Sequence, residues 1–333
     1  MISFSAPSTI IVTCKKRLAP YLKQEIEALG FTPERVFQTG VELKGALKDC
    51  VRLNLNLRCA SQVLFSLKKF RAAKPDDVYE TLIRYPWEDI IPDQGYLSIT
   101  SNVDHFTVNS SMFMNVKVKD AIADRIRRET GKRPDSGPEL DHTVVNLFWK
   151  DDHAEIFIDT SGETLAKHGY RKIPGKAPML EGLAAATVMA TKWDRKSPFV
   201  NPMCGSSTVA IEAALIATDR VPGLYRSNYS FMHVKGYDDA IYREEYAIIE
   251  KQVTDVPGLR IISTDISDDA IDISKVNAGI AGVKDLIDFN VCDFEQTEIP
   301  TQPGVIFFNP EYGDRLGEME ELQGTYARIG DFM

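Results

Sequence analysis

Alternation of short apolar runs with amphipathic segments is the feature of this sequence that most restricts its fold. In the second half of the 333-residue chain, short segments typical of strands occur at 198–202, 260–264, 287–291 and 305–308, the last of which is strongly apolar. The segments with helical spacing lie at 180–192, 207–217, 267–281 and 318–332. Strands that alternate with helices form parallel sheets, so the pattern predicts an α/β domain with a doubly wound sheet.

The first 170 residues predict α+β structure, and they begin with two strand–helix units. Residues 1–72 are expected to form a small ferredoxin-like module that ends in a long helix at 46–70. Residues 73–170 are expected to form a second α+β region. In that region a helix at 111–129 precedes two strands, which are joined by a turn at Asp151-Asp152.

A basic connector at 171–178, which contains proline and glycine, leads into the α/β domain expected at 171–333. Residues 218–258 are rich in Tyr, Asp and Arg and form a predicted insertion between the first two strands. Insertions of this length are usually functional. The chain is therefore expected to have three domains.

Cysteine usage and hydropathy exclude several classes of protein. The five cysteines are scattered, odd in number and never spaced as CxxC, so the sequence predicts neither a zinc site nor a disulfide framework. No run of 18 apolar residues and no secretory signal is present. The predictions are therefore no metal, no membrane span and a cytoplasmic location.

The charge is unevenly distributed. The whole chain has 39 basic and 48 acidic residues and a net charge of -9, which by itself argues against a nucleic-acid partner. However, residues 1–170 contain 23 of each sign, and the deficit lies entirely in the remainder. Between Lys117 and Arg133, seven basic residues accompany three acidic ones. This stretch is either a solvated helix face or a surface for phosphates.

A turn of small residues follows the first strand of the α/β domain, with the sequence Asn-Pro-Met-Cys-Gly-Ser-Ser-Thr at 201–208. Small side chains let the backbone approach a ligand closely, and the amides that begin the next helix favour an anion. A tight strand–helix turn also needs glycine for structural reasons, so both interpretations stay open. The candidate ligand-binding residues are Asn201, Pro202, Cys204, Gly205, Ser206 and Thr208.

Two aspartates follow the next two strands, at the edge where ligands bind in open α/β sheets. Asp265 is placed to accept hydrogen bonds from both ribose hydroxyls of a nucleoside cofactor, unless it only caps the next helix. Asp293 is placed to accept a bond from an adenine amino group, unless it only closes a turn. Their neighbours Ile266 and Phe294 are also candidate cofactor-binding residues.

Asn309, Pro310 and Tyr312 follow the last apolar strand and are the candidate catalytic residues. The side-chain oxygen of Asn309 and the backbone oxygen of Pro310 can accept the two N–H bonds of a planar amine. The nitrogen lone pair is then free to attack an electrophilic methyl group, while Tyr312 stacks on the base. The alternative is a strand that ends in an Asn-Pro turn.

Together these residues resemble the THUMP-domain RNA methyltransferases, and specifically the bacterial family that modifies guanine N2 in 23S ribosomal RNA. The matching segments are 118–122, 124–125, 131–134, 159–162, 168–171, 177–178, 202–206, 208, 211–213, 222–223, 265 and 313–317. The resemblance implies a Rossmann-like class I methyltransferase domain, S-adenosylmethionine as cofactor and RNA as partner. The basic residues that it suggests for RNA binding are Lys117, Lys119, Arg125, Arg128, Lys132, Arg133 and Arg171.

The sequence departs from the family pattern in three respects. Asn201 and Ser207 stand where the family has Asp and Gly, so the methionine end of the cofactor is expected to be held differently. Glu311 replaces a proline of the usual Asn-Pro-Pro-Tyr motif. Only 25 residues follow Phe308, so three C-terminal strands of the family's sheet are expected to be missing, as in a truncated chain or one that pairs with another chain.

The function favoured by these features is methyl transfer to the exocyclic N2 of a guanine in 23S rRNA or in a ribosome-assembly precursor. An adenine-N6 methyltransferase that acts on nucleic acid is one alternative. A non-catalytic RNA-binding or ribosome-assembly factor is the other.

Overall fold

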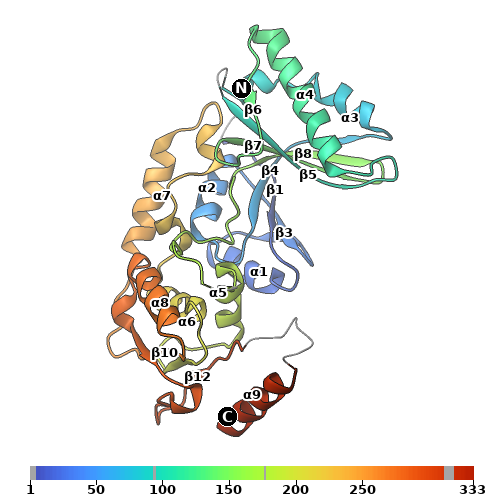
Figure 1. Ribbon diagram of the computed structural model, residues 1–333. Coiled ribbons are helices and arrows are strands. Elements are labelled where there is room, and N and C mark those ends of the chain that lie inside the picture. The colour runs from blue at the N-terminus through green and yellow to red at the C-terminus, as the bar shows by residue number, and fades with distance from the viewer. Residues whose placement is uncertain (1–4, 93–94, 176–177, 311–318) are drawn as a thin grey trace. The chain divides into compact units, whose positions relative to one another are not determined.

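The structure is a computed structural model that describes residues 5–92, 95–175, 178–310 and 319–333. It contains two compact units (Figure 1). The first unit takes the chain as far as Lys167 together with Val221–Lys251, and the second takes His168–Arg220 and Gln252–Met333. Most of the predicted insertion therefore belongs to the first unit, although the chain on both sides of it belongs to the second. The domain boundaries expected at residues 72 and 170 remain predictions.

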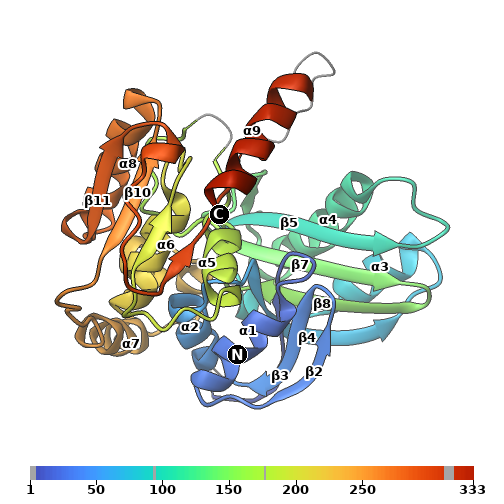
Figure 2. The same cartoon turned by 90° about the horizontal axis from the view of Figure 1, so that it is seen from below.

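The first unit is built on one eight-stranded sheet with the order β2-β3-β1-β4-β8-β7-β5-β6 (Figure 2). The strands are β1 (Ser8–Thr13), β2 (Pro33–Phe37), β3 (Gly40–Gly45), β4 (Gln62–Arg71), β5 (Tyr96–Asp104), β6 (Asp135–Ser136), β7 (Thr143–Lys150) and β8 (His153–Asp159). β5 runs parallel to β6 and β7, and the other neighbouring strands are antiparallel. β4 pairs with both β1 and β8, so a single sheet joins the two α+β regions.

Helices cover this sheet with apolar side chains. They are α1 (Ala19–Ala28), α2 (Leu47–Asn56), α3 (Pro75–Leu82) and α4 (Ser111–Thr130), while α7 (Asp239–Lys251) packs against α2. Along α4, Val118, Ile122 and Ile126 share one face at four-residue spacing and join the core formed with Leu147 and Trp149. α3 and α4 lie side by side over β5 and β7 (Figure 1). Within the described ranges, none of the helices has the length and apolar character needed to cross a membrane.

The prediction of a long helix at 46–70 is wrong. α2 ends at Asn56, Leu57 leaves the helical conformation with φ −77° and ψ 126°, and β4 begins at Gln62. Phe65 of β4 lies opposite Ile10 on one side and Ile158 on the other. A central strand that is buried on both faces has a continuous apolar run, which the spacing of a helix can also accommodate. Hydrogen-bonded pairing with the distant strands β1 and β8 makes this segment a strand and not a helix.

Residues 221–251 pack on the first unit through buried aromatic rings. The rings of Tyr229 and Phe231 are buried and stack with centroids 5.1 Å apart. The short helix η3 (Ser230–His233) is bonded to β7 and to the end of β8, because Ser230 Oγ accepts from the amide of Val144 at 3.0 Å and the amide of Phe231 donates to Thr160 O at 3.1 Å. The insertion therefore completes the first unit.

A buried carboxyl group at the end of β8 makes stability depend on pH. Asp159 accepts hydrogen bonds from the amide of Ser161 at 2.9 Å and from Gln62 Nε2 at 2.8 Å, but burial outweighs them and raises its pKa to about 7. The corresponding pKa in an unfolded chain is about 3.9. The folded state therefore holds the proton more tightly, and this stabilisation is complete below about pH 4 and is lost as the pH rises to about 7.

We expect Asp159 to lower the free energy of unfolding by up to about 1.4 kcal/mol per pH unit across that interval. Urea unfolding at a series of pH values measures this slope. In the variant Asp159→Asn, the free energy of unfolding should depend less on pH in this interval. An unchanged pH dependence would show that Asp159 is not the group responsible.

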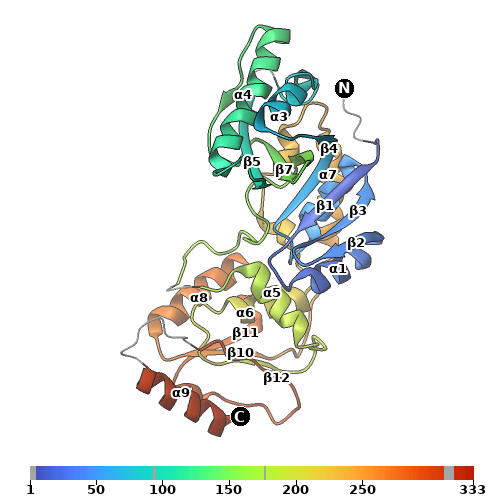
Figure 3. The same cartoon turned by 90° about the vertical axis from the view of Figure 1, so that its right-hand side faces the viewer.

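The second unit contains the expected parallel sheet. Its order is β11-β10-β9-β12, and every neighbouring pair is parallel. Its elements are α5 (Glu181–Ala190), β9 (Phe199–Asn201), α6 (Thr208–Ala217), β10 (Ile261–Asp265), α8 (Asp268–Ile280), β11 (Ile287–Val291), β12 (Val305–Ile306) and α9 (Met319–Phe332). Figure 3 shows α5, α6 and α8 on one side of the sheet and α9 on the other. The predicted α/β Rossmann-like fold is confirmed.

Candidate active site

The glycine-rich turn connects the end of β9 to the start of α6. The amide of Cys204 donates to Thr264 O at 3.0 Å, and the amide of Gly205 donates to Asp265 Oδ2 at 2.8 Å. These bonds hold the turn against the carboxyl end of β10. Met203, Gly205 and Ser207 all have left-handed backbones, with φ between 51° and 54°. The glycine-rich turn and Asp265, the candidate ribose-binding residue, therefore lie in direct contact.

Ser207 adopts a left-handed conformation that favours glycine. Its side chain is fully buried, and its hydroxyl lies 2.9 Å from Ser263 Oγ and 3.1 Å from Cys204 Sγ. The contact with β10 accommodates the serine at a strained position. Burial raises the pKa of the Cys204 thiol to about 11, so this cysteine is no nucleophile at neutral pH.

Asn201 links the ends of two strands. Its side chain is 1% exposed, and Nδ2 donates to Phe307 O at 2.9 Å, just beyond the end of β12. A carboxylate at this position has no proton to donate to that carbonyl. The Asn201 Oδ1 atom is buried and accepts no hydrogen bond from any described residue. A buried acceptor without a partner is uncommon in proteins, and it marks a position where a ligand donor can bind.

Asp265 and Asp293 lie at the carboxyl ends of β10 and β11. Asp265 Oδ1 accepts from the amide of Ser267 at 3.0 Å, so the carboxylate orients the start of α8 as well as the glycine-rich turn. Ile266 is 74% exposed beside it. Asp293 accepts from the amide of Glu295 at 3.0 Å, as a turn-closing residue does.

Helix α9 contacts the segment that follows β11. Arg328 Nη2 lies 2.8 Å from Asp293 Oδ1 and holds the pKa of that carboxyl below its usual range. The rings of Phe308 and Phe332 pack edge-on against Phe294, with centroids 5.9 Å from it. The adenine-side candidates Asp293 and Phe294 are therefore covered by α9, an arrangement that the sequence did not indicate.

Asn309 and Pro310 follow β12 on the same edge of the sheet. The amide of Phe307 donates to Val200 O at 2.8 Å, which continues the pairing with β9 to within two residues of Asn309. The Asn309 side chain is exposed. Tyr312 and Glu311 lie outside the described residues, so the proposed stacking on a base stays a prediction.

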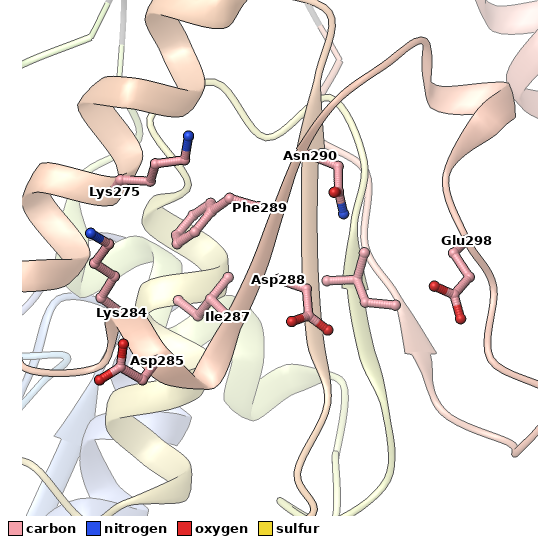
Figure 4. A pocket seen from close by; sticks show the side chains of 9 residues that line it. Lys275, Lys284, Asp285, Ile287, Asp288, Phe289, Asn290 and Glu298 are labelled. Carbon is pink, nitrogen blue, oxygen red and sulfur yellow. The ribbon is translucent and has the colours of Figure 1, made fainter.

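A separate pocket of about 490 Å³ lies beside the edge strand β11 (Figure 4). Lys284, Asp288 and Phe289 are among its lining residues, together with Ile262 near the start of β10. Ile262, Asp288 and Phe289 come from the beginning and middle of β10 and β11, and Lys284 precedes β11. The pocket therefore differs from the candidate site at their carboxyl ends.

Most cations of the predicted RNA-binding stretch are paired with acids. Lys117 bonds Asp76, and Arg125 bonds Glu88 through Nε at 2.9 Å. The other close pairs are Lys119 with Asp120 at 3.1 Å, Arg128 with Glu129 at 2.9 Å and Arg133 with Asp120 at 3.4 Å. Asp76 and Glu88 come from outside the stretch, which is why a local charge count overstated its positive charge.

Arg171 is placed differently from the prediction. Its side chain is only 11% exposed, donates to Thr208 Oγ1 at 2.9 Å, and lies 3.7 Å from Glu181 Oε2. The guanidinium is therefore enclosed within the second unit at the start of α6. Its burial and its partners argue against a contact with RNA phosphates.

Three family models match the chain. They are the RlmL ferredoxin-like domain over residues 9–64, the THUMP domain over 72–159 and the RMKL-like methyltransferase domain over 168–333. A solved structure described as a predicted N6-adenine-specific DNA methylase from Listeria monocytogenes is 30% identical, covers 98% of this chain and 85% of its own, and has a TM-score of 0.87. The chain belongs to the family of THUMP-domain methyltransferases.

Other members of this family differ in length from the chain. The ribosomal RNA large subunit methyltransferase K/L from Syntrophotalea carbinolica is 33% identical over 338 residues, with 98% of this chain and 47% of that protein covered. The chain thus spans about half the length of the curated relatives that it matches. A structure described as a methyltransferase complexed with SAH is 24% identical, covers 98% of this chain and 86% of its own, and shares the fold with a TM-score of 0.87.

Sequence reasoning did not identify Ser263, Ser274 and Asn277 as parts of the site. Ser274 Oγ on α8 donates to Gly205 O at 3.1 Å. Ser274 and Asn277 are both buried and lie three residues apart on the helix. Polar residues with this spacing share one helix face, and this pattern in the sequence could have identified them.

Proposed function

We propose that the chain transfers a methyl group from S-adenosylmethionine to the exocyclic N2 of a guanine in 23S rRNA. The observation that carries this proposal is the common edge of the sheet that Asn201, Asp265, Asn309 and Pro310 share. In open α/β sheets, this edge is where a nucleoside cofactor and its acceptor meet. The name of the Syntrophotalea carbinolica relative supports ribosomal RNA as the substrate.

The described residues at the ends of β9 and β10 fit the cofactor, whereas α9 covers the adenine-side candidates Asp293 and Phe294. The buried Oδ1 of Asn201 lacks a donor, and a methionine ammonium group would supply one. Asp265 uses one bond on each carboxylate oxygen, and a carboxylate has about four acceptor positions, so two remain for ribose hydroxyls. The exposed side chain of Ile266 offers apolar area to a base. SAH in the related structure supports the same choice.

Asn309 and Pro310 prepare the acceptor amine. When bound, S-adenosylmethionine supplies an electrophilic methyl group on a sulfonium. Asn309 Oδ1 and Pro310 O accept the two N–H bonds of the amine and so direct its lone pair away from the base plane. Transfer of the methyl group would place positive charge on the amine nitrogen, and the two oxygens would stabilise this charge until the amine gives up a proton to water.

The RNA contact is proposed for the exposed end of α4. Arg127 and Lys132 are exposed there, and neither forms an ion pair with another described residue. Lys119 and Arg133 can exchange their partner Asp120 for phosphate, whereas the Arg125 pair with Glu88 is largely shielded from solvent. The substrate base must leave its stack to reach a site at a sheet edge. Methylation of rRNA also implies a cytoplasmic location.

The test combines calorimetry with product analysis. The chain is titrated with S-adenosylmethionine and is then incubated with isotopically labelled cofactor and either a 23S rRNA transcript or a DNA duplex. N2-methylguanosine in the digested rRNA is the expected result. N6-methyladenine would instead support the activity named for the Listeria relative. Absence of cofactor binding would leave the non-catalytic RNA-binding alternative.

A further inference from the structure

The connector that begins the second unit is held by side-chain hydrogen bonds along its first three residues. Residues 171–175, here called the strap, have no regular secondary structure. Arg171 bonds Thr208 Oγ1, and Asn277 Oδ1 on α8 accepts from the amides of Lys172 and Ile173 at 3.1 and 3.2 Å. Asn277 Nδ2 donates to Ile173 O at 2.9 Å. One buried amide group thus satisfies three backbone groups of the strap.

The same face of α8 also holds the glycine-rich turn. Ser274, one helical turn before Asn277, donates its hydroxyl to Gly205 O at 3.1 Å. At the far end of the strap, a Cβ atom built on Gly175 would lie 3.1 Å from Ser206 Cβ. The strap therefore lies directly against the turn, and α8 fixes both segments.

Asparagine suits this position because it has both an acceptor and a donor. Its oxygen faces two N–H groups while its nitrogen faces a carbonyl. Aspartate keeps the acceptor but brings a negative charge to Ile173 O, which then loses its donor. An unpaired buried carbonyl is costly, so the strap would move away from α8 and from the turn.

We infer that Asn277 is a positioning residue for the cofactor, and that the strap which it holds forms a wall of the cofactor site beside the glycine-rich turn. The inference rests on the proposed function, because it assigns a role in binding S-adenosylmethionine. Asn277 acts through the strap and touches none of the candidate catalytic residues.

The main test compares Asn277→Asp with Asn54→Asp in the full 333-residue chain. Asn54 is a matched control, because it is also buried and its Nδ2 donates to Cys50 O at 2.7 Å and to Thr160 Oγ1 at 2.8 Å in the first unit. Calorimetric titration with SAH is run at a temperature where both variants are folded. We expect Asn277→Asp to raise the Kd for SAH about tenfold, and Asn54→Asp to change it by less than about twofold.

Trypsin provides a readout of the strap itself, because Arg171 and Lys172 are cleavage sites. SAH should protect these sites in the unaltered chain, and Asn277→Asp should be cut there faster. In a methylation assay, the same variant should raise KM for S-adenosylmethionine and leave kcat unchanged at saturation.

A second variant tests the wall without altering α8. Gly175→Ala places a methyl group against Ser206 and should weaken SAH binding, whereas Gly279→Ala on α8 meets no atom within 4 Å and should not. Faster cleavage of the strap in Asn277→Asp together with an unchanged Kd for SAH would overturn the inference but not the proposed function. Binding of SAH by Gly175→Ala with the affinity of the unaltered chain would do the same. Failure of the unaltered chain to bind SAH would overturn the proposed function and the inference together.

Discussion

Replacing Asn309 with alanine is expected to lower kcat for methyl transfer by about a hundredfold to a thousandfold, the range seen when one transition-state hydrogen bond is removed. The variant loses the side-chain oxygen that accepts an N–H of the amine, so the lone pair is no longer directed and the developing positive charge has one acceptor fewer. The exposed side chain of Asn309 contributes little to folding. Cofactor affinity should therefore stay the same.

Single-turnover assays with labelled S-adenosylmethionine and rRNA measure this effect, and calorimetry with SAH measures affinity separately. Asn290→Ala is the matched control, because Asn290 is an exposed asparagine of β11 that lines the separate pocket. Activity of Asn309→Ala within a few-fold of the unaltered chain would exclude Asn309 as the acceptor of the substrate amine.

Replacing Glu212 with alanine should destabilise the second unit by about 1–3 kcal/mol, the cost of removing one partner from a buried hydrogen bond. His168 Nδ1 lies 2.7 Å from Glu212 Oε1, and both side chains are fully buried. Without the carboxylate, the imidazole keeps its burial but loses this partner. The pair joins the first residue of the second unit to the middle of α6.

Urea unfolding, followed with a probe specific to the second unit, gives this value. Glu27→Ala is the control, because Glu27 forms an exposed pair with Lys23 and should cost less than about 0.5 kcal/mol. The double variant His168→Phe, Glu212→Leu should recover part of the loss, because two apolar side chains can replace a buried pair. A loss below about 1 kcal/mol in Glu212→Ala would show that the pair contributes little.

The sequence predicted the second unit well because its signals are local. Short strand signals such as 260–264, followed by a helix-starting residue, specify parallel strands with little competition, and the candidate residues at their ends follow directly. For β4 the same reasoning gave a helix, because a central strand with both faces buried loses the two-residue alternation that identifies strands. Its partners, β1 and β8, are more than 40 residues away in the chain.

The sequence could not predict which charged side chains pair with each other. Arg171 has the same charge in a sequence whether it faces solvent or Thr208 and Glu181, and Arg125 could not be assigned to Glu88, 37 residues away. Helix α9 over Asp293 is another contact between distant segments. The candidate site was therefore predictable at the level of strand ends but not at the level of which charges remain free.

The placement of residues 221–251 determines when each unit can fold during synthesis. The first unit lacks α7 and η3 until residue 251 has left the ribosome, and Val234, which packs in the core of the α4 region, arrives late as well. The second unit has β9 by residue 201 but must wait for β10 and β11 to complete its sheet. Domains usually fold one after another as they emerge. In this chain the first unit cannot finish until His168–Arg220 of the second has been made, so a nascent chain has to keep two incomplete cores apart at the same time.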